Sequence, residues 1–182
     1  MHAFIRLWRS FAQNGERRDE RCGMKQYYRR RFRYFAEVIF YVDRPFLQVQ
    51  KGDYGIALME IQSGRKETHW IWYIFPQLKD LGHSETSEYY GIRDMAEAKE
   101  YLAHPVLRRW LLETGQLLLN LPSSDAREIL GFPDSLKLRS SMTLFALAEL
   151  SCKVFQQVLD KYYDGCMDQK TVEMFHSKAS TR

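Results

Sequence analysis

A regular pattern of apolar and polar positions starts near Asp53 and favours helices. Apolar residues recur at helical spacing between residues 54 and 61, as they do on the buried face of an amphipathic helix. Asp53 can cap the start of this helix, and Gly64 stands in the usual place just after its end. The pattern therefore predicts a first well-defined helix between Asp53 and Gly64.

The next segment, residues 66–82, is unusually rich in aromatic residues. Thr68 can cap a second helix, which should end near Phe75 because the following Pro76 disfavours helical backbone in the residue before it. Within that helix His69 and Trp72 are about one turn apart and share a face. Residue propensity also allows a strand, but no partner strand is evident, so a helix is preferred.

The rest of the chain predicts further short helices, each with its own start or stop signal. These are a short helix capped by Ser84 and ending at Gly91, a helix opened by Asp94 and Glu97, one with Pro105 in its first turn, one over 123–130, one capped by Asp134 over 134–150, and a final pair at 153–163 and 168–175. We predict an all-α, compact single domain of about six to eight short helices. Its core should include Trp70, Trp72, Phe75, Trp110, Leu117, Met142 and Phe145.

Length and charge divide the chain into three parts. Its 182 residues, 45% hydrophobic, suit one domain, placed at 43–177, with a basic extension at 1–42 and a disordered tail at 178–182. Residues 1–36 hold ten Lys/Arg against three Asp/Glu. Arginines interleaved with aromatics in 24–42 could touch nucleic acid or a membrane surface, but a partly disordered or helical, solvated segment is the simpler interpretation.

Several classes of protein are disfavoured by missing signals. No secretory leader or long apolar run is readable, so a cytoplasmic location is expected. The three cysteines form no CxxC pair, and the histidines have no metal-ligand spacing, which argues against a disulfide framework and a metal site. No common nucleotide or cofactor motif occurs, so no cofactor is predicted. Oligomeric state is not predicted by any feature.

The aromatic segment is the first candidate site. Trp70, Trp72 and Gln77 could line a pocket for a small ligand, because aromatic walls with a few polar groups are typical of such pockets. His69 is a candidate catalytic acid or base. The alternative is that His69 is a buried imidazole bonded to backbone and that the tryptophans only fill the core.

The second candidate site is the segment 137–144, KLRSSMTL, where Lys137, Ser140, Ser141 and Thr143 interrupt an apolar helix. Hydroxyl residues are poor interior helix formers, so their presence needs a reason. Lys137 and Ser141 are four residues apart and could together hold a phosphate or carboxylate, although Asp134 would oppose an anion there. The alternative is that the serines allow close helix packing and that Lys137 points to water.

These two runs, with F-L-x-x-Q at 46–50, Y-G-I at 90–92 and E-A-x-x-Y-L at 97–102, resemble the family called domain of unknown function 1810. The resemblance implies a mainly helical, bacterial, cytoplasmic domain with no established activity. Members are often labelled calpastatin, but a protease inhibitor of that kind is expected to be disordered and repetitive, and this chain is not. One departure is the sequence Leu107, Arg108, Arg109, where the family tends to have Leu-Gly before an Arg.

Two functions follow from these observations. The first is binding, or hydrolysis with His69 as acid or base, of a small anionic, nucleotide-like ligand between the two candidate segments. The second is a non-catalytic interaction module in which both runs only specify the core. The first predicts that His69 and Lys137 open on one concavity, with the hydroxyl of Ser140 or Ser141 between them and Trp70 or Trp72 on one wall.

Overall fold

The computed structural model describes residues 46–179 of the chain, with side chains up to 177. This part consists of a helix over residues 46–62 followed by α3 (Ile71–Ile74), α4 (Glu85–Tyr89), α5 (Met95–Ala103), α6 (Pro105–Asn120), α7 (Ala126–Leu130), α8 (Asp134–Ala148), α9 (Lys153–Tyr163) and α10 (Gln169–Ala179). Over this range there is no strand, only an isolated parallel bridge between Leu78 and Ile92. The predicted all-α fold class is confirmed. The predicted extension at 1–42 lies outside the described residues. Of the predicted tail at 178–182, only the backbone of residues 178 and 179 is described.

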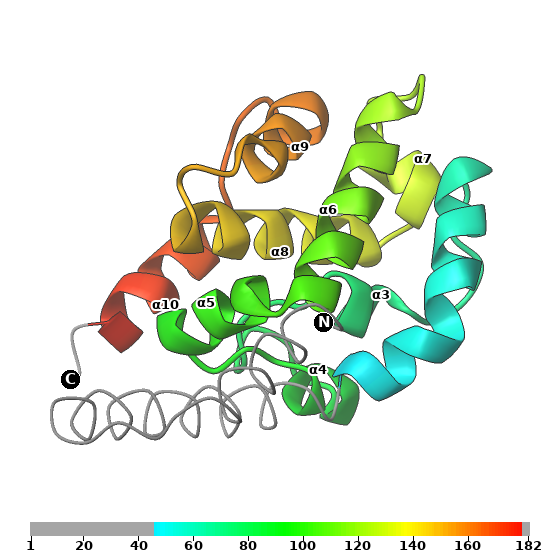
Figure 1. Cartoon of the computed structure of the whole chain (residues 1–182). Coiled ribbons are helices and arrows are strands. Elements are labelled where there is room, and N and C mark those ends of the chain that lie inside the picture. The colour runs from blue at the N-terminus through cyan, green and yellow to red at the C-terminus, as the bar shows by residue number, and fades with distance from the viewer. Residues whose placement is uncertain (1–45, 180–182) are drawn as a thin grey trace, which may run out of the picture. The chain divides into compact units, whose positions relative to one another are not determined.

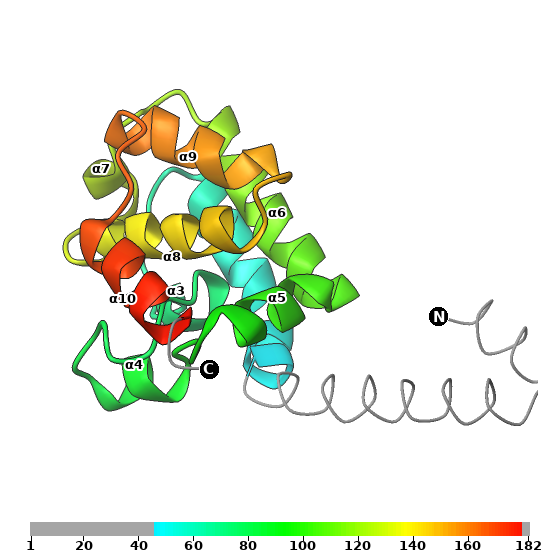
Figure 2. The same cartoon turned by 90° about the vertical axis from the view of Figure 1, so that its left-hand side faces the viewer.

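Helix α8 is the central element of the domain (Figures 1 and 2). Helix α9 packs along one side of it, while α3 and α5 lie on the other, and α7 and α10 also contact it. Ten of the fifteen residues of α8 are buried, including Met142 and Phe145. A helix that is covered on several sides has no single buried stripe opposite a solvent-facing one, which explains why it shows little amphipathic pattern.

The first helix does not start at Asp53, so that prediction was wrong. Residues 46–52 are already helical. Phe46 and Gln50 are buried, and the Gln50 amide donates hydrogen bonds to the carbonyl of Tyr73 (2.5 Å) and the hydroxyl of Tyr101 (3.1 Å). These distant contacts stabilise helical turns that the local pattern does not reveal. The predicted end is confirmed, because Gly64 has a φ of 72° and its N–H donates to Ile61.

The aromatic helix, α3, is shorter than predicted. It starts at Ile71 rather than after Thr68, and its N-cap residue, Trp70, makes no side-chain capping bond. The Thr68 hydroxyl instead donates to the carboxylate of Glu60 at 2.8 Å. The helix ends at Ile74, just before Phe75 and Pro76, as the proline rule predicts.

Local signals located most of the remaining helix starts. Ser84 and Asp94 accept hydrogen bonds from the first turns of α4 and α5, and Pro105 opens α6. Two starts differ from the prediction: Asp125 caps α7, and Asp134 lies inside the first turn of α8 rather than at its cap. These differences shift boundaries by a few residues and leave the helix order unchanged.

Most of the predicted core is buried. Trp70, Phe75, Met142 and Phe145 are inaccessible to solvent, and Trp72 and Leu117 are partly buried against the core. Trp110 is only half-buried and stacks on Tyr54 with 4.7 Å between ring centroids.

Candidate functional site

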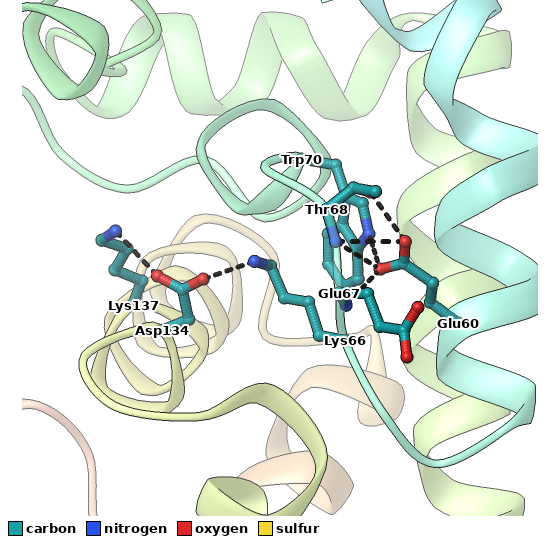
Figure 3. A network of polar contacts seen from close by, with 7 residues as sticks. All are labelled: Glu60, Lys66, Glu67, Thr68, Trp70, Asp134 and Lys137. Carbon is teal, nitrogen blue, oxygen red and sulfur yellow. Dashed lines mark hydrogen bonds and ion pairs between the residues drawn. The ribbon is translucent and has the colours of Figure 1, made fainter.

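The carboxylate of Glu60 holds the start of the aromatic segment in place (Figure 3). It accepts hydrogen bonds from the backbone N–H groups of Glu67 (2.8 Å) and Thr68 (3.1 Å), the Thr68 hydroxyl (2.8 Å) and the indole N–H of Trp70 (2.7 Å). Trp70 is fully buried, so its indole N–H needs a partner inside the protein. Thr68 and Trp70 of the T-H-W run therefore have a structural role.

We expect Glu60→Ala to lower the free energy of unfolding by about 2 kcal/mol at neutral pH, because several donors lose a charged acceptor. Burial raises the pKa of the Glu60 carboxyl, but the hydrogen bonds from Glu67, Thr68 and Trp70 outweigh it and leave the pKa below its ordinary value. The stabilisation by this carboxylate is therefore complete above the ordinary pKa of 4.5 and is lost as the pH falls through the lower folded value.

Urea unfolding of wild type and Glu60→Ala at several pH values measures this effect. The difference in stability should narrow below about pH 4. Glu67→Ala is the matched control, because this neighbouring side chain is exposed and takes part in the network of Figure 3 through its backbone N–H, which the substitution keeps. An equal decrease in the free energy of unfolding for Glu60→Ala and Glu67→Ala would show that the Glu60 network does not stabilise the fold.

A second cluster joins the aromatic segment to α8. Asp134 accepts a salt bridge from Lys66 on one oxygen (2.7 Å) and from Lys137 on the other (2.8 Å), as Figure 3 shows. The Lys66 side chain is 7% exposed, that of Asp134 14% and that of Lys137 19%. Burial raises the pKa of the Asp134 carboxyl, but both ammonium groups outweigh it and the pKa is lowered. Two cations and one anion leave the cluster with a formal charge of +1.

The Lys137 ammonium brings the two candidate segments together. It lies 4.2 Å from the centre of the Trp72 ring, within the range of a cation–π interaction. On the same indole, the exposed His69 imidazole has its ring centroid 6.3 Å from that of Trp72. His69, Trp72 and Lys137 thus share one indole, and we call these three side chains the Trp72 surface.

Trp70 belongs to a different part of the network. Its ring lies beneath the Lys66 ammonium, 5.3 Å from the ring centre, and its N–H is bound by Glu60. It is fully buried, whereas Trp72 is only partly buried. The Trp72 indole N–H is buried as well, without a hydrogen-bond partner in the described structure.

Two of the three candidate hydroxyl groups on α8 bond to the backbone of the preceding turn. Ser140 donates to the carbonyl of Leu136 (3.1 Å), and Thr143 donates to that of Arg139 (2.9 Å). Thr143 also accepts the backbone N–H of Asp168 at 2.9 Å and so anchors the start of α10. Ser141 is fully buried, and its hydroxyl has no recorded hydrogen-bond partner in the described part of the chain.

Gln77 contacts residues outside this cluster. Its side chain is buried, and its amide nitrogen would be 3.2 Å from a Cβ atom built on Gly82. Its backbone carbonyl accepts the N–H of Ile92 at 2.9 Å, next to the bridge between Leu78 and Ile92. These contacts place Gln77 at the turn before α4.

Two hollows of the described surface lie around Arg108 at the start of α6, and none of His69, Trp72 and Lys137 lines them. Within residues 46–179, no group of three or more His, Cys, Asp or Glu side chains could hold a metal ion. None of the helices in that range has the length and apolar character needed to cross a membrane.

The sequence did not reveal Glu60 or the paired role of Asp134 and Lys66. Lys66 and Asp134 are 68 positions apart in the chain, and an ion pair between distant residues has no local signature. Oppositely charged residues within otherwise apolar runs were the available signal, but they do not specify partners.

Residues 41–175 match a family described as "Protein of unknown function (DUF1810)". Among solved structures, the chain is similar to the crystal structure of the conserved hypothetical protein Rv1873 from Mycobacterium tuberculosis at 1.38 Å. The sequences are 41% identical, the TM-score is 0.72, and the match covers 74% of this chain and 96% of that one. Comparison with curated proteins gives no significant match.

Proposed function

The chain belongs to the DUF1810 family of proteins of unknown function, and from this premise we propose that its domain binds a small anionic ligand with a flat ring. The ligand would lie on the Trp72 surface, with its anionic group at Lys137 and its ring beside Trp72 and His69. A nucleoside monophosphate has this chemistry.

The position of the Lys137 ammonium is the observation that carries this proposal. An ammonium has three N–H donors, and Asp134 takes one of them. The side chain is neither fully buried nor fully solvated, and its cluster carries a net positive charge. Donors that remain beside an aromatic ring suit a phosphate or carboxylate attached to a planar group.

We propose binding rather than hydrolysis. The His69 ring contacts the Trp72 indole. In the described part of the chain, no carboxylate lies within hydrogen-bonding distance of the His69 imidazole. A general base usually needs a group that orients it. The assignment of His69 as a catalytic acid or base stays a prediction from the sequence.

The alternative function is a non-catalytic interaction module in which this cluster only fastens the aromatic segment to α8. The contacts of Thr68, Trp70, Ser140 and Thr143 favour a structural role for much of both runs. The two functions differ in one measurable property, which is whether a small anion competes for the Lys137 ammonium.

Calorimetric titration of the full chain with adenosine monophosphate, ribose phosphate and adenosine tests the proposal. Adenosine monophosphate should bind more tightly than ribose phosphate or adenosine alone. Lys137→Met should weaken its binding by about tenfold, which corresponds to about 1.4 kcal/mol of binding free energy. Lys170→Met is the matched control, because Lys170 is an exposed lysine on α10.

Trp72→Phe provides a second variant that keeps an apolar ring while changing the stacking surface. This substitution should weaken the binding of adenosine monophosphate more than the binding of ribose phosphate. No binding to wild type, or equal binding by Lys137→Met and Lys170→Met, would overturn the proposed function and favour the interaction module.

A further inference from the structure

Two neighbouring hollows meet at Arg108, on a surface to which α5, α6, the end of α8 and the start of α9 contribute. The larger, of about 650 Å³, is an open groove that includes Arg109, Leu112 and Val154. The smaller, of about 260 Å³, includes Lys99. Arg108 lines both. We call this surface the Arg108 groove.

The Arg108 guanidinium forms a two-point salt bridge with the carboxylate of Glu149, whose second contact is 3.1 Å long. The two side chains are 35% and 28% exposed. The guanidinium fork matches a carboxylate in shape, and water reaches this pair. A carboxylate from another molecule that made the same two contacts would replace one two-point salt bridge by another.

Other charges near the pair favour an incoming anion. Lys99 and Arg109 are exposed and lie in the two hollows. The opposing Glu113 carboxylate accepts the hydroxyl of Tyr54 at 2.6 Å. The charges of Arg108 and Glu149 cancel. Lys99 and Arg109 then contribute two positive charges against the one negative charge of Glu113, so the groove has a formal charge of +1.

Apolar groups lie beside these charges. Leu112 and Val154 line the larger hollow. Leu150, which follows Glu149, is 85% exposed. A single exposed leucine is ordinary, but this one directly follows the carboxylate partner of Arg108 in the chain. This combination resembles the anchor pocket and charged rim of a protein interface.

We propose that the Arg108 groove docks an acidic segment of a partner protein. A partner carboxylate replaces Glu149 on Arg108, and a partner leucine-like side chain packs against Leu112 and Val154. Because the groove is open rather than enclosed, an extended segment fits it better than a small molecule that must be surrounded. This inference does not depend on the Trp72 surface.

Fluorescence polarisation of the full chain with labelled peptides tests the inference. The probe is a short peptide that alternates Leu and Glu, and its matched controls replace every Glu by Gln or by Lys. The acidic peptide should bind, and the other two should bind at least about tenfold more weakly. Binding should also weaken with added salt.

Variants of the ion pair decide the mechanism. Glu149→Gln frees Arg108 from its internal partner and should tighten binding of the acidic peptide, whereas Arg108→Gln should weaken it about tenfold. Lys137→Met should leave the binding of the acidic peptide unchanged, which distinguishes binding at this groove from binding at the Trp72 surface. Thermal unfolding of each variant reports whether the fold is retained.

Three results would overturn the inference. They are no binding of the acidic peptide to wild type, equal binding of the acidic and Gln peptides, or binding that Glu149→Gln fails to tighten. If Arg108→Gln does not fold, the Glu149→Gln result still decides, because that change keeps the guanidinium and nearly the same shape.

Discussion

Asp134→Ala is expected to lower the free energy of unfolding by about 3–5 kcal/mol, because it leaves a nearly buried cation without its counter-ion. The Lys66 side chain is only 7% exposed, and the Asp134 carboxylate is its salt-bridge partner at 2.7 Å. Lys137 is more exposed and can recover water. Most of the loss should therefore come from Lys66.

Chemical denaturation of three variants separates this explanation from a general effect of losing a carboxylate. Lys66→Met combined with Asp134→Leu should recover most of the stability, since no buried charge remains. Asp160→Ala, at an exposed carboxylate on α9, should change it by less than about 0.5 kcal/mol. A double variant as unstable as Asp134→Ala would contradict the assignment.

Gly91→Ala is expected to destabilise the protein by about 2–3 kcal/mol through overpacking. A Cβ atom at Gly91 would lie 2.7 Å from the Cα of Lys79 and 2.9 Å from the carbonyl oxygen of Ser87. Both are backbone atoms, which cannot rotate away as a side chain can. The close approach is fixed by the two hydrogen bonds of the parallel bridge, in which the Lys79 N–H donates to the Ile92 carbonyl and the Ile92 N–H donates to the Gln77 carbonyl.

Gly55→Ala is the matched control for Gly91→Ala. Gly55 lies within the helix at 46–62, and a Cβ atom there would meet nothing within 4 Å. Alanine is favoured over glycine inside a helix, so this change should stabilise the protein by about 0.5–1 kcal/mol. Thermal and urea unfolding of both variants provide the comparison. We expect Gly91→Ala to lower the free energy of unfolding and Gly55→Ala to raise it. Changes in the same direction would contradict the packing argument.

The sequence predicted helices best where the signal is local. Ser84, Asp94 and Pro105 each mark a helix start that depends on a few neighbouring residues. The helix at 46–62 starts earlier than expected because Gln50 bonds to Tyr73 and Tyr101. No local pattern contains those partners.

The candidate site was predictable in part for the same reason. The sequence predicted His69 and Trp72 on one helical turn, and their rings do lie near each other, although His69 precedes the start of α3 at Ile71. The placement of Lys137 over Trp72 depends on how α8 packs against α3. Thr143 was a candidate ligand residue, but its hydroxyl serves the backbone of α8 and α10. Mid-helix hydroxyls commonly bond to the preceding turn in this way.

The most direct test of the proposed function follows the indole N–H groups by NMR while adenosine monophosphate is added to the full chain. Trp72→Phe identifies the Trp72 signal by its disappearance. We predict that this signal shifts in a saturable manner, because the ligand ring lies beside Trp72, and that the Trp110 signal stays in place. A titration in which Trp72 does not respond, or in which Trp110 responds instead, would contradict ligand binding at the Trp72 surface.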